Sequence, residues 1–285
     1  MIQVFIAGIL WGVIGVFVKG LASLGADGAL TGFLRMFWAF VIVLAVSLVK
    51  HGRGVILRDK TALFYCVLLG LVSNGIFNIL YTASIRINGM GIACVLMYTA
   101  PVFTAVASAI IFREKFSPLK ISALCVNIIG CVLTVTGGDF SGSDVSLAGI
   151  LAGLGSGFGY GMAAVIGRLA GERTDSLTVS VYSYLAAWIF IAVFTRPDIP
   201  LALGSPKIMG LGFLYGLVPT VLAYLVYYNA LRIIPDTAKV PVIASVEPVT
   251  AVLIGIMIYG EEIGAANLVG VAVVMISIII MAKAK

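Results

Sequence analysis

The chain has 285 residues, of which 61% are hydrophobic and 11% are charged, and its mean hydropathy is +1.17. A soluble globular protein carries about 25% charged residues, so this composition excludes a soluble domain and favours a membrane protein. The net charge of +6 comes from Lys and Arg scattered over short loops, which argues against a nucleic-acid-binding surface.

Apolar blocks of about 20 residues recur along the chain, and each is long enough to cross about 30 Å of hydrocarbon. The blocks are continuous, which excludes an outer-membrane barrel. A small-residue cleavage site is missing after the first block, so we retain that block as a mature helix. The sequence predicts an all-α polytopic membrane protein with ten transmembrane helices, at about 3–22, 29–49, 61–84, 91–112, 117–136, 147–167, 177–195, 208–231, 238–259 and 264–282.

The distribution of Lys and Arg predicts the orientation of these spans. With the N-terminus inside, the cytoplasmic segments hold thirteen Lys and Arg residues and the outer ends hold four. Cytoplasmic loops of membrane proteins carry the excess of positive charge. We therefore expect both termini in the cytoplasm.

The two halves of the chain resemble each other. Landmarks recur at offsets of 146 or 147 residues, pairing Tyr81 with Tyr227, Arg86 with Arg232, Pro101 with Pro248 and Glu114 with Glu261. At the start of each half an offset of 149 pairs Gly8, Gly12, Gly15 and Lys19 with Gly157, Gly161, Ala164 and Arg168. Each half has five spans, so the second copy enters the membrane upside down. We expect inverted five-helix repeats at 1–139 and 140–285, which is typical of secondary transporters.

An acid and a proline, Glu247-Pro248, stand in the middle of the ninth span. A carboxylate at the bilayer centre costs about 2.5–3.5 kcal/mol on insertion scales, and proline removes a backbone donor and kinks the helix. This face is therefore expected to look into protein or a wet cavity. Glu247 is either a functional group, receiving a substrate ammonium or a coupling proton, or a neutral or paired group in a packing contact.

Polar side chains follow the third and eighth spans at the spacing i, i+4, i+7, which shares one face of an α-helix. The two stripes are Asn74, Asn78 and Tyr81, and, at an offset of 146, Thr220, Tyr224 and Tyr227. They either line a central cavity or form interhelical hydrogen bonds. The aromatic residues Trp11, Tyr98, Tyr160 and Tyr228 add a π-rich surface able to hold an ammonium group or an aromatic ring.

Further charged residues suggest coupling or gating. Arg35 lies within the second span, where it either snorkels outward or pairs with a carboxylate. Lys19 and Glu261 are expected at the outer side, and Arg168 and Glu114 at the inner side. Each pair is either a gate contact or a set of exposed helix-end charges that contribute little.

Enzymatic activity is not expected. The one histidine lies in a basic loop, every aspartate lies in a loop or at a helix end, and no P-loop motif occurs. The four cysteines lie inside apolar blocks at spacings that fit no metal template. We therefore expect neither a metal nor a cofactor.

Several motifs in order, Leu10-Trp11-Gly12, Leu34-Arg35, Glu247-Pro248 and Gly260-Glu261, resemble the EamA branch of the drug/metabolite transporter superfamily. The first half departs from the pattern, with Ala100-Pro101 in place of the acid–proline pair and Arg113-Glu114 in place of Gly-Glu. The resemblance implies an inner-membrane carrier, commonly an exporter of amino acids, amines or related metabolites. It also implies a central cavity lined by the first, third, fourth, sixth, eighth and ninth spans.

The sequence thus predicts a secondary transporter that works by alternating access around a midplane cavity. Its partners would be the lipid bilayer, a small-molecule substrate and a coupling proton. The alternatives are a passive facilitator or channel, an importer of nucleobases or sugars, and a membrane scaffold that transports nothing. The expected substrate-binding residues are Trp11, Asn74, Asn78, Tyr81, Tyr98, Thr220, Tyr224, Tyr227 and Glu247.

Overall fold

The computed structural model describes residues 1–52, 56–138, 146–260 and 264–284. In these ranges ten helical segments are long and apolar enough to cross a membrane, which confirms the all-α fold with ten spans. The third and sixth spans continue to Asn88 and Gly171, four residues beyond their expected ends. Both helices continue past the apolar stretches from which the spans were predicted, through Arg86 and Arg168.

The first five spans are built from eight α-helices and one π-helical segment, η2. In chain order they are α1 (Ile2–Gly12) with α2 (Ile14–Ser23); α3 (Gly28–His51); α4 (Lys60–Leu69), η2 (Gly70–Ile76) and α5 (Phe77–Asn88); α6 (Met90–Met97) with α7 (Ala100–Ile111); and α8 (Pro118–Thr136). The break at Val13 between α1 and α2 has no counterpart in the prediction.

The last five spans follow a similar plan, except that the sixth span is one continuous helix and a short extra helix precedes the eighth. They are α9 (Leu147–Gly171); α10 (Ser176–Thr195); α12 (Pro206–Gly216), η3 (Leu217–Leu222) and α13 (Ala223–Ile233); α14 (Lys239–Ala244) with α15 (Val246–Tyr259); and α16 (Ala265–Lys283). The short α11 (Ile199–Leu203) lies in the proline-rich connection before α12, where no helix was predicted. Both π-helical segments occur in matching spans, the third and the eighth.

Local sequence explains where many spans begin. At the N-caps of α3, α4, α8, α10 and α12, a side-chain oxygen accepts a backbone N–H of the first turn; the capping residues are Asp27, Asp59, Ser117, Asp175 and Ser205. Such caps satisfy N–H groups that have no partner within the helix. The N–H groups of Ala62 and Thr61 lower the pKa of Asp59, so this cap is charged at neutral pH.

Prolines interrupt the fourth and ninth spans at matching positions. Proline has no N–H to donate to the carbonyl four residues earlier. Pro101 therefore leaves Met97 O, and Pro248 leaves Ala244 O, without the usual α-helical hydrogen bond. The helices separate at Tyr98–Thr99 and at Ser245. The predicted disruption beside Glu247 is therefore present, one turn before the proline.

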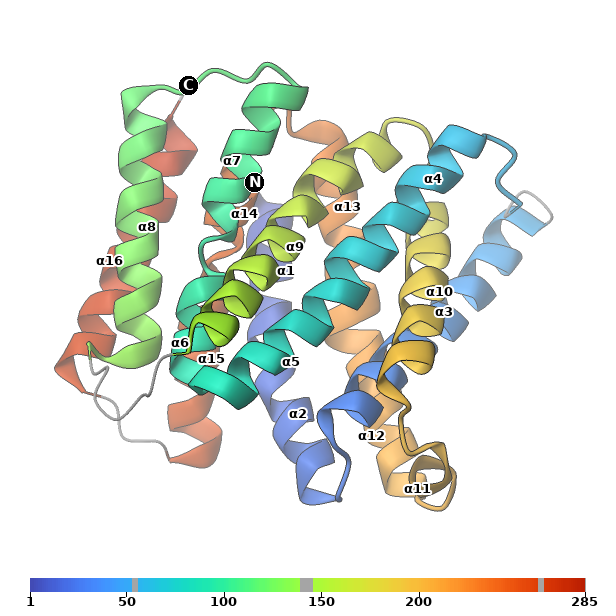
Figure 1. Cartoon of the computed structure of the whole chain (residues 1–285). Helices are drawn as coiled ribbons and strands as arrows, with labels where there is room; N and C mark the ends of the chain where they lie inside the picture. The colour runs from blue at the N-terminus through green and yellow to red at the C-terminus, as the bar shows by residue number, and fades with distance from the viewer. Residues whose placement is uncertain (53–55, 139–145, 261–263, 285) are drawn as a thin grey trace.

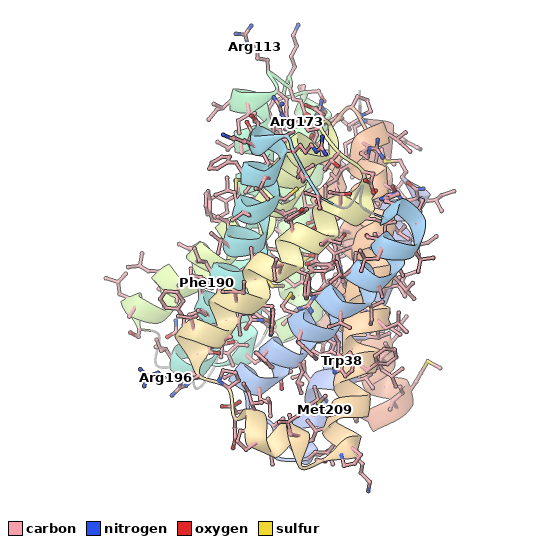
Figure 2. All side chains as sticks on the ribbon, turned by 90° about the vertical axis from the view of Figure 1, so that its right-hand side faces the viewer. Trp38, Arg113, Arg173, Phe190, Arg196 and Met209 are labelled. Atoms are coloured by element: carbon pink, nitrogen blue, oxygen red, sulfur yellow. The ribbon has the colours of Figure 1, made fainter. Side chains whose placement is uncertain are left out.

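Figure 1 shows α9 crossing the middle of the bundle, and it packs against the third, fourth and eighth spans. The first span packs against the eighth and ninth, the second against the seventh, and the fifth against the tenth. In Figure 2, Arg113 and Arg173 lie at one end of the molecule and Arg196 at the other. Ten spans place both chain ends on the same side.

Candidate functional site

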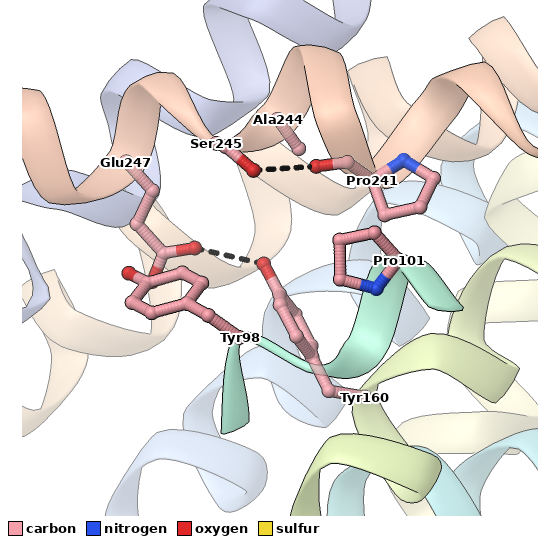
Figure 3. A pocket seen from close by; sticks show the side chains of 7 residues that line it. All are labelled: Tyr98, Pro101, Tyr160, Pro241, Ala244, Ser245 and Glu247. Atoms are coloured by element: carbon pink, nitrogen blue, oxygen red, sulfur yellow. Dashed lines mark hydrogen bonds between the residues drawn. The ribbon is translucent and has the colours of Figure 1, made fainter. Parts of the chain in front are cut away.

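Glu247 lies in the first turn of α15, directly after the break in the ninth span, and is half-buried. Its Oε2 accepts a hydrogen bond from the Tyr160 hydroxyl of α9 at 2.8 Å. Figure 3 shows the two side chains meeting across a pocket between these spans. The structure therefore directs this intramembrane acid into protein, as the sequence predicted.

The pocket is formed mainly by the two broken spans. Its lining residues are Tyr98 and Pro101 from the fourth span, Tyr160 from the sixth, and Pro241, Ala244, Ser245 and Glu247 from the ninth. It leaves no room even for a water molecule, so the pocket is closed in this structure. Pockets that enclose drug-sized ligands have about 300–1,000 Å³, so this one must open to hold a metabolite.

An aromatic cluster continues from Tyr160 into the centre of the bundle. The ring of Trp11 lies 6.1 Å from that of Tyr160 and 5.0 Å from those of Tyr224 and Tyr227, measured between centroids. Trp11, Tyr224 and Tyr227 are almost fully buried. The structure thus brings together Trp11, Tyr98, Tyr224, Tyr227 and Glu247 from the predicted set.

The polar stripe of the third span does not stay on one face. Asn74 is buried near Tyr228, the Asn78 amide lies against Gly32 of α3, and the Tyr81 hydroxyl is 2.8 Å from Cys94 Sγ. The spacing i, i+4, i+7 shares a face only in a continuous α-helix, and the wider turn of η2 changes that register. Tyr81 still reaches the aromatic cluster through Phe77, which stacks on both Tyr81 and Tyr160.

Arg35 is 7% exposed, so it does not snorkel to the surface. Its Nε donates to Thr220 Oγ1 at 3.0 Å, and the guanidinium lies 5.3 Å from the ring centroid of Tyr215. It makes no salt bridge with any residue that the structure describes. Thr220, the first member of the eighth-span stripe, thus faces the second span. It lies within the π-helical segment η3, whereas Tyr224 lies in α13 (Ala223–Ile233).

Arg168 and Glu114 form an ion pair at one end of the bundle, with Arg168 Nη1 2.8 Å from Glu114 Oε1. Their side chains are 18% and 11% exposed, so they are not free helix-end charges. Arg168 also donates to Pro235 O and Thr237 Oγ1, while Glu114 accepts the backbone N–H groups of Thr237 and Ala238. This network connects the end of the fourth span to the sixth and to the start of the ninth.

The other expected pair is only partly described. Lys19 Nζ lies 4.2 Å from the ring centroid of Tyr259, at the end of the ninth span. Glu261 lies outside the described residues. The contact does, however, bring the end of α2 to the end of α15.

Two features of the site are absent from the residue set predicted by sequence. Tyr160 was noted as an aromatic residue of the sixth span, but its bond to Glu247 depends on how the sixth and ninth spans pack. Ser245 at the helix break donates to Asn127 Oδ1 at 3.2 Å, and Asn127 Nδ2 donates to Ser277 Oγ at 3.0 Å. The only sign of this hydrogen-bond chain in the sequence was a polar residue, Asn127, within an apolar span.

Comparison with known proteins agrees with this architecture. A transporter of uncharacterized function from Archaeoglobus fulgidus is 26% identical over 97% of this chain and 94% of its own length. The threonine/homoserine exporter RhtA of Escherichia coli K12 is 29% identical over 72% of this chain and 66% of its own length. A protein of known crystal structure has the same fold, with a TM-score of 0.81 at 17% identity over 99% of this chain and 97% of its own.

The profile of the EamA-like transporter family matches the chain twice, over residues 1–136 and 147–283. The relatives named above are transporters, which points away from an enzyme. Together with ten apolar spans, these matches define a multi-pass membrane protein that moves a small molecule. The chain is a membrane transporter of the EamA-like family, within the drug/metabolite transporter superfamily.

Proposed function

We propose that the chain is a secondary transporter of the inner membrane that exports small amino acids or amines by alternating access. The single observation that carries the proposal is the carboxylate of Glu247, half-buried in a break of the ninth span and bonded to Tyr160. An ionisable group at this depth marks a substrate or ion pathway. The relative RhtA, a threonine/homoserine exporter, supports amino acids as the substrate class.

The helix packing supports an inverted repeat with halves 1–139 and 140–285. A Cβ added at Gly12 would lie 2.9 Å from Glu247 O, and one at Gly161 would lie 2.6 Å from Ala100 O. Gly12 and Gly161 are paired by the offset of 149, and Ala100 and Glu247 by that of 147. The first span therefore approaches the ninth as the sixth approaches the fourth, which is the exchange that a twofold axis in the membrane plane would produce.

The Arg168–Glu114 network supports a gate at the cytoplasmic end. It joins the fourth, sixth and ninth spans, all of which line the pocket, so the pocket cannot open to this side until the network breaks. We place both termini in the cytoplasm, and we assign Lys19 and Glu261 to the outer gate. Proton exchange at Glu247 is the proposed coupling step.

Counterflow in proteoliposomes tests the proposal. Vesicles loaded with unlabelled L-threonine should accumulate external labelled L-threonine, because a carrier exchanges substrate across its site. Replacing Glu247 by Gln should reduce this exchange by at least about tenfold, since a hydrogen bond to a charged group contributes about 1.5–3 kcal/mol. Panels of other amino acids, polyamines, nucleobases and sugars, run in the same vesicles, define the substrate range.

The matched control is Asp198→Asn, which makes the same chemical change at the N-cap of α11, where Asn still accepts the Leu201 N–H. This variant should exchange substrate like the unmodified protein. If the flux neither saturates nor is accelerated by internal substrate, the protein is a channel and not a carrier. Normal exchange by a correctly folded Glu247→Gln variant would show that the Glu247 carboxylate is not needed for transport.

A further inference from the structure

The second span carries a cation whose role the proposed transport cycle does not yet explain. Arg35 is buried at bilayer depth in α3, where a charge is expensive unless it is paired. Tyr184, Tyr215 and Tyr224 surround the guanidinium, and Thr220 accepts from its Nε. No carboxylate of the described residues lies within salt-bridge distance, so the positive charge has no direct counter-ion there.

Arg35 and Glu247 both lie next to the aromatic cluster. Contacts run from Arg35 to Tyr224, from Tyr224 to Trp11, from Trp11 to Tyr160, and from Tyr160 to Glu247. Glu247 is near enough to interact electrostatically with Arg35, but the two do not pair. One buried positive group and one half-buried negative group thus border the same aromatic cluster.

Trp11, between these charges, contributes an unused donor. Its side chain is 3% exposed, and its indole Nε1 has no hydrogen-bond acceptor among the described residues. A buried N–H without an acceptor is destabilising, and an acceptor on a bound substrate would satisfy it. The indoles of Trp38 and Trp188 also lack acceptors among the described residues, but only Trp11 contacts Tyr160 and Tyr224. Trp11 and Tyr160 occupy equivalent positions in the two halves, and Tyr160 does have an acidic partner, Glu247.

Resting on the transport function proposed above, we propose that the site binds the zwitterionic form of an α-amino acid through both of its charges. Glu247 and Tyr160 receive the ammonium group. The guanidinium of Arg35 and the indole N–H of Trp11 receive the carboxylate, which supplies the missing acceptor and counter-ion. Arginine suits this role because its planar fork binds a carboxylate through two parallel hydrogen bonds. The narrow pocket and the aromatic cluster separate to admit the substrate between them.

The test removes one charge of the ligand at a time. Purified protein in detergent is titrated with L-threonine, L-threonine methyl ester and N-acetyl-L-threonine, and the thermal unfolding midpoint gives each apparent Kd. The ester keeps the ammonium and loses the carboxylate, whereas the acetyl derivative does the reverse. We expect each derivative to bind at least about tenfold more weakly than L-threonine, because a charged hydrogen bond is lost.

Variants of the protein then show which residue is responsible for each loss of affinity. Arg35→Gln should bind L-threonine and its methyl ester equally, while still rejecting the acetyl derivative. Glu247→Gln should show the converse, equal binding of L-threonine and N-acetyl-L-threonine. Arg86→Gln, which removes an exposed arginine at the end of α5, serves as the control and should keep both preferences. If Arg35→Gln fails to fold, Arg35→Lys takes its place, because lysine keeps the charge but lacks the planar fork. Arg35→Lys should prefer L-threonine over its methyl ester less strongly than the unmodified protein does.

The outcomes separate this inference from the transport proposal. If the unmodified protein binds L-threonine and its ester equally, Arg35 is no carboxylate receptor, although an amine or amino-acid carrier remains. A folded Arg35→Gln variant that still prefers the acid would overturn the assignment in the same way. If none of the amino acids and amines stabilises the protein or is exchanged in vesicles, the transport proposal itself fails.

Discussion

The fourth and ninth spans are broken in the same way, but only one of them carries the acid. Both separate before a proline, and in both a glycine of a neighbouring span packs against the opened backbone: Gly157 on the fourth and Gly8 on the ninth. At the next equivalent position the fourth span has Ala100 and the ninth has Glu247. The backbone geometry is thus shared by the two halves, whereas the charge belongs to one.

The two breaks also differ in the hydrogen bonds that their hydroxyl side chains make. Thr99 Oγ1 donates to Leu96 O within its own span at 2.6 Å. Ser245 Oγ is within hydrogen-bond distance of both Pro241 O and Asn127 Oδ1. The break next to the acid therefore also contacts the fifth span.

Moving the acid between the two breaks should have the largest effect. We expect the double variant Ala100→Glu/Glu247→Ala to transport at least about tenfold less than the unmodified protein, because Tyr160 remains opposite position 247 and the charged hydrogen bond is lost. Counterflow of L-threonine in proteoliposomes measures this, with the thermal midpoint as the check on folding. Transport equal to that of the unmodified protein would show that the two halves are interchangeable.

Adding a methyl group to the packed glycines should cost the same in both halves. A Cβ at Gly8 would lie 2.6 Å from Ala244 O, and one at Gly157 would lie 2.7 Å from Leu96 O. These backbone atoms cannot move aside easily, so Gly8→Ala and Gly157→Ala should each lower the free energy of unfolding by about 2–3 kcal/mol. Denaturant titration in detergent gives the values.

Gly15 provides the control for this pair, because no atom lies within 4 Å of the position of an added Cβ. Alanine there should be neutral or stabilising, since glycine inside a helix costs about 0.5–1 kcal/mol relative to alanine. A large loss from only one of the two packed glycines would mean that the first and sixth spans do not approach their broken neighbours alike.

The contact between the fourth and ninth spans at Glu114 should have the smallest effect. A double-mutant cycle with Glu114→Gln and Arg168→Gln should give an interaction energy of about 1–2 kcal/mol, because both side chains are largely buried. The comparison pair, Asp59 and Arg173, is 43% and 45% exposed, and its cycle should give a smaller interaction energy because water screens the pair. Equal values for the two cycles would remove the reason for treating Arg168–Glu114 as a gate.

Much of the fold was accessible from the sequence because a bilayer restricts the choices. Backbone polar groups in hydrocarbon must bond within their own helix, so ten apolar blocks became ten spans with nearly the expected limits. Glu247-Pro248 also acts locally, and its effect on the backbone followed from the residue types, whereas the matching break before Pro101 was not predicted. The polar stripe of the third span could not be predicted in the same way, because η2 changes the register that the α-helical spacing assumes.

The sequence by itself determined the number of spans, the helix break beside Glu247-Pro248 and the presence of an acid at bilayer depth, since each depends on nearby residues and on the cost of burying polar groups. Only the tertiary structure decided which groups meet: Tyr160 with Glu247, Arg35 with Thr220, and Arg168 with Glu114. These contacts join residues 54 to 185 positions apart in the chain. Their formation depends on how whole helices pack, which no local pattern specifies.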